Sequence, residues 1–340
     1  MEMKKINIDI INEKLITMGR SPIILERDTY PEIRINKEGT SLVDQYGNPI
    51  GTKGDMYQKL FIEQILTNIE RSLDIDPRPR YKSDGVPAHS ISLNHGAFNK
   101  VVTYDLTKGE SPLLTLQPTA FKTATGEILW IYQEQSNDLS ILRDKYGVKW
   151  WDDWDIGDGT IGMTYGAIIK RHDLVNKLLN GIIANPDGRR HMIDMWQEED
   201  YSEKHGLRPC AFLTNWNVRH GEDGVDYLDL MLTQRSSDFQ VAGAVNQTQY
   251  VVLQYMFARH LGLTPGRFTW SFDNVQIYDR HVNQAIELLN REPVNCNPHI
   301  ELNDNVVNFY DFKVDDVKLV NYPRNEIKEK NKKLTYDLAV

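Results

Sequence analysis

Segments with the pattern of strands and segments with the pattern of helices are interspersed along this chain, but they do not alternate as regular βαβ units. Alternating residues fit strands at 210–219, 226–234 and 268–278, and apolar residues recur at helical spacing across 246–261. A doubly wound parallel sheet requires regular strand–helix alternation. The order of the segments therefore favours an α+β fold.

Helical periodicity also runs from about 122 to 146, across 166–184 and across 281–291. Residues 1–54 differ, because they combine short alternating segments with clusters of turn residues. We predict two units, with residues 1–54 forming a β-rich N-terminal extension of unknown role and residues 55–340 forming the main domain.

The charge balance narrows the possible partners. The chain has 39 Lys and Arg residues against 48 Asp and Glu residues, a formal net charge of −9. A protein that coats duplex nucleic acid needs a basic face, so we expect no nucleic-acid partner. A small phosphorylated ligand held by a few local arginines is still compatible with this charge.

Neither a membrane nor a metal is expected from the sequence. No apolar run reaches the roughly 18 residues that indicate a membrane span, and the N-terminus has no apolar signal core. The chain has two cysteines, too few for a disulfide framework or a zinc cluster. We expect a cytoplasmic protein.

Cys210 is the candidate nucleophile. It follows Arg208 and Pro209 at the start of a predicted strand, and Arg235 ends a later strand that can converge on it. A reactive thiol needs nearby positive charge that favours the thiolate. The ordinary alternative is a small buried core residue, which is the commoner case for an isolated cysteine.

Three other features each allow two interpretations. Arg189 and Arg190 follow a turn, and they fit either a phosphate clamp or a solvated pair. Glu127 lies in an apolar helical segment, either on a solvated face or buried with a raised pKa and a proton-transfer role. The three tryptophans in 150–154 fit either the core or an aromatic wall for a planar ligand.

Taken together, the motifs resemble the thymidylate synthase family over residues 75 to 340, in family order and with nearly family spacing. The motifs are Gly126–Trp130, Trp151–Trp154, Gly162–Gly166, Asn185–Arg190, Pro209-Cys210, Gln234–Asp238, Asn246 with Tyr250, and Gln276–His281. Ser83–His89 and Phe309–Phe312 resemble a Bacillus and phage branch. The resemblance implies an α+β homodimer whose mixed sheets, with flanking helices, stack back to back. For a phage-encoded protein, the location would be the host cytoplasm.

The resemblance also implies catalytic roles. Cys210 would add to C6 of dUMP, and Glu127 would organise proton transfer at the base oxygen O4. Tyr165 would assist later removal of the C5 proton, and Asp238 would contact both the pterin and the uracil edge. The cosubstrate would be 5,10-methylenetetrahydrofolate, with no metal.

The remaining implied site residues bind the two substrates. Those for the nucleotide are Arg235, Ser236 and Gln234 at the phosphate, Arg189 and Arg190 from the partner subunit, Arg78 or Arg80 on a mobile loop, Asn246 at the base, Tyr278 at the ribose, and Gln276 where the family has histidine. Those for the folate are Trp151, Leu207, Asp238, Gly243, Val245 and the C-terminal Val340.

Asn246 indicates the base. Its amide can donate to O4 of uracil and accept from N3–H, whereas cytosine presents the opposite pattern. Relatives that act on cytosine nucleotides carry Asp at this position, so Asn246 indicates dUMP.

The folate side departs from the family pattern, since Ala244 and Val245 stand where the family has Pro and Phe. A smaller, looser face would admit water. We therefore slightly favour water capture giving 5-hydroxymethyl-dUMP, with hydride transfer giving dTMP as the alternative. A non-catalytic nucleotide- or RNA-binding relative is the third reading. The presence of Cys210, Glu127 and Tyr165 is evidence against it, because binding alone does not need them.

Overall fold

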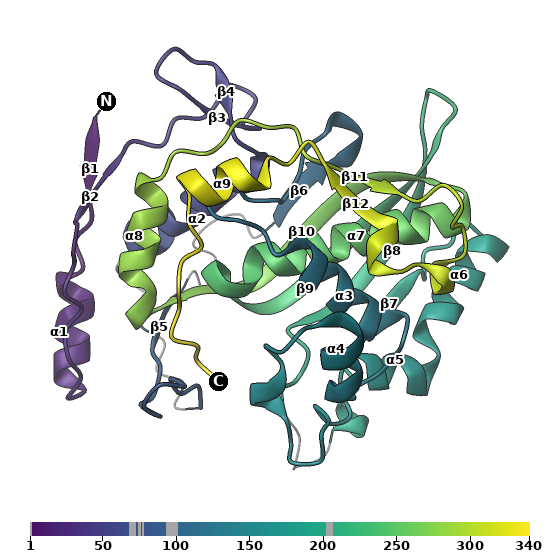
Figure 1. The fold of residues 1–340 in the computed structure, drawn as a ribbon, viewed down its shortest axis with the longest axis horizontal. Helices are drawn as coiled ribbons and strands as arrows, with labels where there is room; N and C mark the ends of the chain where they lie inside the picture. The colour runs from purple at the N-terminus through teal and green to yellow at the C-terminus, as the bar shows by residue number, and fades with distance from the viewer. Residues whose placement is uncertain (1, 68–72, 74–75, 77, 93–100, 202–206) are drawn as a thin grey trace.

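The computed structural model describes residues 2–67, 73, 76, 78–92, 101–201 and 207–340 (Figure 1). Its centre is a six-stranded sheet in which strands pair in the order β5-β10-β9-β8-β7, with β6 also paired to β10. The strands are β5 (Ser90–Ser92), β6 (Val101–Asp105), β7 (Met192–Asp194), β8 (Ala211–His220), β9 (Asp226–Asp238) and β10 (Thr264–Tyr278).

The sheet is mixed, because β9 and β10 run parallel while the other neighbours are antiparallel. The parallel register places Asp238 opposite Gln276. Parallel neighbours end at the same edge of a sheet, so the carboxyl ends of β9 and β10 bring two predicted site motifs together. This arrangement confirms the α+β class.

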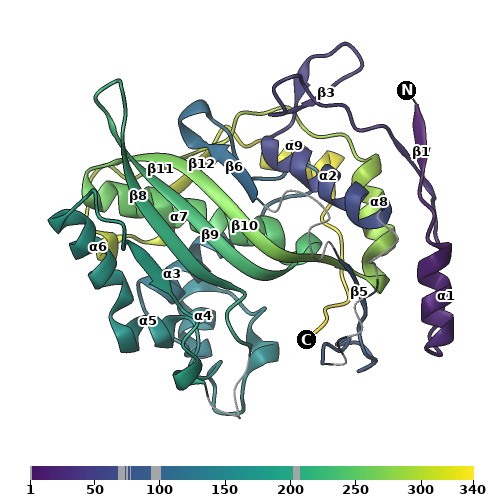
Figure 2. The same ribbon diagram turned by 180° about the vertical axis from the view of Figure 1, so that it is seen from behind.

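Helices cover one face of the sheet. The long helix α7 (Ala244–Leu261) packs on β9 and β10, and α3 (Phe121–Tyr132) packs on α7. Figure 2 shows the opposite face of β8, β9 and β10 open toward the viewer. The other helices are α2 (Lys53–Thr67), α4 (Leu139–Tyr146), α5 (Gly166–His172), α6 (Leu174–Ala184), α8 (Val282–Asn290) and α9 (Arg324–Lys330).

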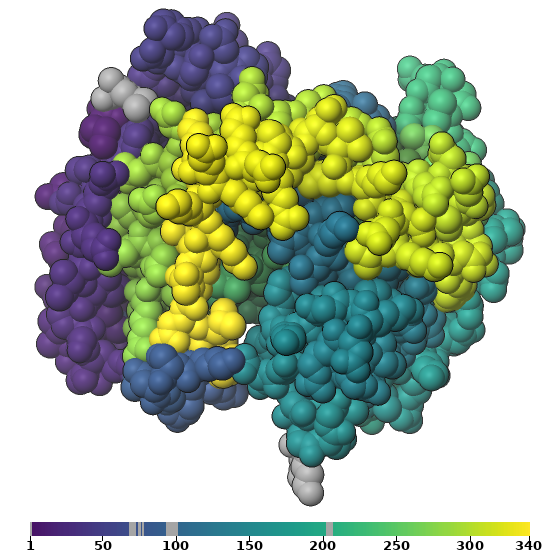
Figure 3. All heavy atoms as spheres, in the orientation of Figure 1, coloured from purple at the N-terminus to yellow at the C-terminus, as the bar shows by residue number. Residues whose placement is uncertain are grey.

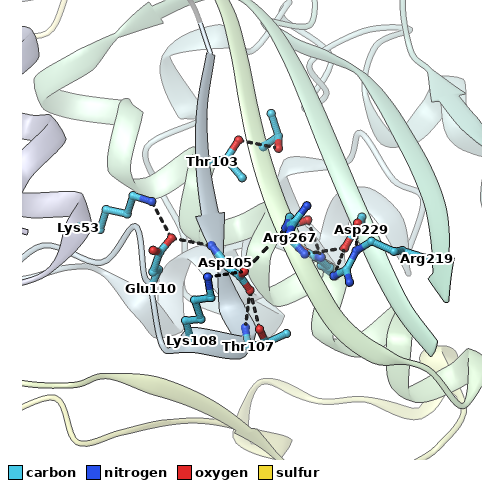
Figure 4. Close-up of polar contacts among 11 residues, drawn as sticks. Lys53, Thr103, Asp105, Thr107, Lys108, Glu110, Arg219, Asp229 and Arg267 are labelled. Atoms are coloured by element: carbon cyan, nitrogen blue, oxygen red, sulfur yellow. Dashed lines mark hydrogen bonds and ion pairs between the residues drawn. The ribbon is translucent and has the colours of Figure 1, made fainter. Parts of the chain in front are cut away.

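A row of alternating charges joins four neighbouring strands at one end of the sheet (Figure 4). Arg219 on β8 pairs with Asp229 on β9 at 2.8 Å, and Arg267 on β10 lies 3.7 Å from Asp105 on β6. Asp229 also accepts from the backbone N–H of Arg267 at 2.7 Å, beside the bulge in the β9–β10 register. Each of these partly exposed ion pairs contributes little to the free energy of folding. Together they connect the ends of neighbouring strands.

Residues 2–52 contain short strands and also a helix that was not expected from the sequence. The strands are β1 (Met3–Lys5), β2 (Thr29–Pro31), β3 (Leu42–Val43) and β4 (Pro49–Ile50), and the helix is α1 (Asp9–Thr17). The extension packs beside α8 and α2, where the Tyr30 hydroxyl donates to Glu63 at 2.7 Å and Asn290 donates to the Thr29 carbonyl at 3.0 Å. The division at residue 54 stays a prediction.

Two helices expected to be continuous are broken. The segment 122–146 divides into α3 and α4, and 166–184 divides into α5 and α6 at Asp173, whose φ is +51°. Within the C-terminal part, β12 (Val317–Val320) pairs with β11 (His299–Leu302). In the described residues, no helix is long and apolar enough to cross a membrane.

Candidate active site

Cys210 and Arg235 meet at the start of β8. The backbone N–H of Arg235 donates to the Cys210 carbonyl at 2.9 Å. The Arg235 guanidinium donates to the carbonyls of Pro209 and Arg208 at 3.0 and 2.9 Å. Arg235 therefore hydrogen-bonds three successive carbonyls of the segment that carries the thiol. The pairing of β8 with β9 thus brings together two motifs that lie 25 residues apart in sequence.

Two opposing effects act on the Cys210 thiol. Burial raises its pKa above the ordinary value, and the positive charge of Arg235 acts to lower it. Tyr165 also lies here, since its hydroxyl accepts from the backbone N–H of Cys210 at 3.0 Å. Tyr165 has a φ of +45°, a backbone conformation that is rare for residues other than glycine. Such strain is typical of functional positions.

Glu127 is buried, which decides between the two interpretations left open by its sequence context. It lies on α3, and the indole N–H of Trp150 donates to its carboxylate. Burial raises the pKa of Glu127, and the hydrogen bond from Trp150 opposes that rise. A buried carboxyl group with a raised pKa can act as a proton donor or acceptor.

A chain of hydrogen bonds runs from the sheet to Gln249 on α7. Trp270 donates to Gln234 at 2.9 Å, Gln234 donates to the Asn246 carbonyl oxygen at 3.0 Å, and the Asn246 NH₂ group donates to Gln249 at 3.1 Å. These contacts fix which end of the Asn246 amide is donor and which is acceptor. Gln249 was not among the predicted site residues, although its position three residues after Asn246 places both on one face of α7.

The ends of β9 and β10 form a polar row. The Ser236 hydroxyl donates to Gln276 at 3.3 Å, and Asp238 lies opposite Gln276 in the register. Burial raises the pKa of Asp238 to about 7, with backbone hydrogen bonds opposing the rise. Its Oδ1 atom is buried without a hydrogen-bond partner among the described residues. A buried unpaired carboxylate oxygen is costly, so this atom is a candidate contact for a bound ligand. Tyr278, also buried, ends β10.

The two residues predicted to wall the folate site, Trp151 and Leu207, contact neighbouring residues of the segment 162–166. The Trp151 ring lies edge-on to Tyr165, with ring centroids 5.2 Å apart. The carbonyl of Leu207 accepts from Thr164 at 3.2 Å. A side chain at Gly243 would place its Cβ 2.8 Å from the Phe239 ring, so the close approach of Phe239 requires glycine there. The half-buried Val245 follows in the first turn of α7.

Apart from Arg235, the predicted phosphate arginines make their contacts outside this cluster. Arg78 is exposed and pairs with Asp76. Arg80 donates to the Gly85 carbonyl at 3.0 Å, and its backbone exchanges two hydrogen bonds of 2.9 Å with Val340. Arg189 and Arg190 are both exposed on the loop between α6 and β7.

Figure 3 shows a hollow between the C-terminal tail and the middle part of the chain.

Within the described ranges, no group of three or more His, Cys, Asp or Glu side chains is arranged to hold a metal ion. Cys296, which the sequence analysis did not favour as a nucleophile, has a pKa raised to about 12, chiefly by burial.

Comparisons with known proteins agree with the motif pattern. A family model described as thymidylate synthase matches residues 79–332. A thymidylate synthase from Streptococcus pneumoniae (strain 70585) is 47% identical over 291 residues, which cover 85% of this chain and 100% of the relative. One from Streptococcus gordonii (strain Challis) is 46% identical over the same length.

A solved structure gives the same result for the fold. The thermostable thymidylate synthase A from Bacillus subtilis superposes with a TM-score of 0.73 at 33% identity, covering 84% of this chain and 99% of that chain. The expected fold family is therefore confirmed.

The Arg235 charge should control the titration of the Cys210 thiol. In a Cys296→Ser background, we expect Arg235→Gln to move the pH midpoint of Cys210 alkylation by iodoacetamide upward, because the cation that favours the thiolate is lost. Arg208→Gln is the control, and it should shift the midpoint less. Equal midpoints in the Arg235 variant and the parent would show that Arg235 does not act on the thiol.

Proposed function

The chain belongs to the thymidylate synthase family, and we propose that it transfers a one-carbon unit from methylenetetrahydrofolate to C5 of dUMP. The observation that carries this proposal is that Cys210, Arg235 and Tyr165 contact one another at the start of β8. The hydrogen-bonded Asn246 amide and the buried Glu127 support it. These are the groups needed for covalent attack on a pyrimidine, for reading its edge and for moving its protons.

Cys210 would carry the covalent step. C5 of uracil is a poor nucleophile, and addition of the Cys210 thiolate to C6 moves an electron pair toward C5 and O4. Covalent catalysis thus divides one difficult substitution into easier steps. The thiol pKa is raised by burial, so Arg235 has to favour the thiolate when the nucleotide is bound.

Two groups would handle protons at the base. Glu127, with its raised pKa, would stabilise and protonate the developing charge on O4. The hydroxyl of Tyr165, already held at the Cys210 backbone, would assist loss of the C5 proton. Asn246 would donate to O4 and accept from N3–H after exchanging its present amide partners for the base.

The residues on the folate side fit a pterin. The unpartnered Oδ1 of Asp238 offers an acceptor for ring N–H groups, and the Trp151 ring offers an apolar wall. When bound, methylenetetrahydrofolate supplies the one-carbon unit and, for a methyl product, also the hydride. Val340, whose backbone is hydrogen-bonded to that of Arg80, would help to exclude water.

We place the methyl product, dTMP, first. The relatives at 46–47% identity are thymidylate synthases, which supports this product over the hydroxymethyl product that the sequence analysis favoured. The hydroxymethyl product is the second candidate, because Val245 is smaller than the family's Phe and the unpaired Asp238 oxygen can hold a water.

The active unit would be a homodimer. The open face of β8, β9 and β10 offers a surface for back-to-back stacking with a second copy (Figure 2). Arg189 and Arg190 are exposed, as they must be to complete the phosphate site of a partner.

Product analysis tests the proposed function. With dUMP and methylenetetrahydrofolate, we expect a nucleotide heavier by one CH₂ unit and an equal amount of dihydrofolate, followed by mass spectrometry and near-ultraviolet absorbance. Cys210→Ser should abolish both, and Cys296→Ser should retain both. A product heavier by CH₂O, with oxygen from labelled water, would instead establish hydroxymethylation. Binding of dUMP without turnover would leave only the non-catalytic reading.

Base choice should depend on Asn246. We expect Asn246→Asp to shift kcat/KM from dUMP toward dCMP by about 10- to 100-fold, since a mismatched buried amide contact costs about 1–3 kcal/mol. Asn305→Asp, on an exposed turn that follows β11, is a control that should leave the ratio unchanged. An unaltered dUMP/dCMP ratio in the Asn246 variant would remove this residue from base recognition.

Shared sites predict complementation between inactive chains. A chain with Arg189→Ala and Arg190→Ala should be nearly inactive, as should a chain with Cys210→Ala. Mixed heterodimers should regain up to about half of wild-type activity per dimer, because one of the two sites then has both parts intact. Heterodimers that form but stay inactive would contradict a shared site.

A further inference from the structure

The loop 185–190, which joins α6 to β7, carries the two arginines proposed to act in a partner's site. The side chains of Arg189 and Arg190 are exposed, so the positions of their guanidinium groups depend on how the backbone of the loop is held. Ordering a loop and two long side chains during binding costs conformational entropy. Two histidines contact this loop, His191 just before β7 and His220 at the end of β8.

His191 holds the inner side of the loop. Its ring is buried, and its Nε2 atom lies 2.8 Å from the Asn185 carbonyl. A carbonyl can only accept, so Nε2 carries the proton and donates. The backbone of His191 is fixed in turn, because the N–H of Trp216 on β8 donates to its carbonyl at 2.8 Å. A Cβ atom at Gly188 would lie 2.6 Å from the His191 Nε2 atom, so the loop can pass over this ring only with glycine at 188.

His220 joins the loop to the sheet. Its Nε2 atom lies 2.9 Å from a carboxylate oxygen of Asp187 on the loop, and its Nδ1 atom lies 2.6 Å from a carboxylate oxygen of Asp226. Asp226 is its partner in the register of β8 and β9. Ionised carboxylates only accept, so both ring nitrogens must donate, which requires the doubly protonated imidazolium. The geometry therefore describes a cation that bridges a carboxylate on the loop and another on β9.

The two carboxylates favour this cation. Hydrogen bonds to Asp187 and then Asp226 raise the pKa of His220 above its ordinary value of 6.5. Because the pKa is raised, the ionic contact is fully present below pH 6.5 and is lost as the pH rises through the raised pKa. The other charged side chains on the adjoining elements are Arg219 on β8, Glu222 and Asp223 in the hairpin turn, and Arg189 and Arg190 on the loop.

We propose that Asp187 and His220 are positioning residues that hold the loop 185–190 against the end of β8, so that Arg189 and Arg190 are placed before a nucleotide phosphate arrives. The role in binding rests on the proposed function, because it assumes that the arginines act at a partner's site. The attachment of the loop rests on the contacts alone. Neither residue touches the reacting atoms, so the effect is on KM for dUMP more than on kcat.

The first test measures loop attachment without any ligand. In the full chain, Asp187→Ala should speed amide hydrogen exchange in 185–190 by about 2- to 5-fold, the size expected for loss of an exposed ion pair. Histidine C2–H exchange, followed by mass spectrometry, should show a lower pKa for His220 in the same variant. Glu222→Gln removes an equal charge from the same hairpin, and it should change both quantities less. With melting curves that show folded variants, unchanged amide exchange in Asp187→Ala would overturn the proposal.

The second test asks in which subunit Asp187 acts. In a heterodimer of a Cys210→Ala chain with an Arg189→Ala, Arg190→Ala chain, the one complete site uses the thiol of the second chain and the arginines of the first. Adding Asp187→Ala to the first chain should raise KM for dUMP by about 2- to 5-fold. Adding it to the second chain should leave KM unchanged, because the arginines of that chain are already absent. Equal KM values for the two placements would overturn the positioning role.

The third test uses pH. The ratio of KM for dUMP between Asp187→Ala and the parent should be largest below pH 6.5 and fall toward 1 as the pH rises through the raised pKa of His220, since the parent then loses the ionic contact. Taking the ratio removes titrations that both proteins share, such as that of the nucleotide phosphate. A ratio that does not change with pH would exclude His220 as the partner through which Asp187 acts.

Failure of the proposed function gives a different pattern of results. An inactive starting heterodimer would refute the shared site, and with it the role of Asp187 in nucleotide binding. The amide exchange rates would still decide whether Asp187 and His220 hold the loop.

Discussion

The parallel pairing of β9 with β10 is the constraint on which the site depends. It places Asp238 opposite Gln276 and ends both strands at one edge. Because side chains alternate across a strand, a slip of one residue in the pairing would put Ser236 and Asp238 on the opposite face of the sheet. The same two strands support α7, and β10 leads into the turn Asp279–His281.

The helix that lies on this sheet is unusually polar on its buried side. Gln247, Gln249 and Gln254 of α7 are all buried. Buried amides are costly unless they are hydrogen-bonded. Gln247 accepts from Tyr104 at 2.9 Å, and Gln254 donates to the Leu228 carbonyl at 2.7 Å, so two of them anchor the helix to the sheet. Gln249 instead accepts from the site residue Asn246 at 3.1 Å, so the helix that is anchored to the sheet also carries the predicted base contact.

The sequence predicted elements such as α7 and β10, in which apolar residues recur at the spacing of a helix or a strand. It missed the break after α3, because apolar residues continue at helical spacing into α4 while the chain turns between them. It missed α1, because Ile6 and Ile8 alternate like a strand while Ile8, Ile11 and Leu15 are buried at helical spacing. The orientation of Glu127 was undecidable from its own segment, since nearly every residue from Phe121 to Tyr132 is buried.

The acidic chain and the proposed anionic substrate are compatible because charge acts locally here. At physiological ionic strength the Debye length is about 8 Å, so most of the net charge of −9 is screened at the site. In the proposed site, a phosphate would contact the arginine that lies close to Cys210. Arg235 is half-buried, its guanidinium lies 5.5 Å from the Trp196 ring centroid, and its N–H groups are fixed on two backbone carbonyls. A guanidinium held in this way is already oriented, so binding of a phosphate does not carry the entropic cost of ordering a free side chain. The favourable contact with this arginine can therefore exceed the weak, screened repulsion between the phosphate and the acidic surface.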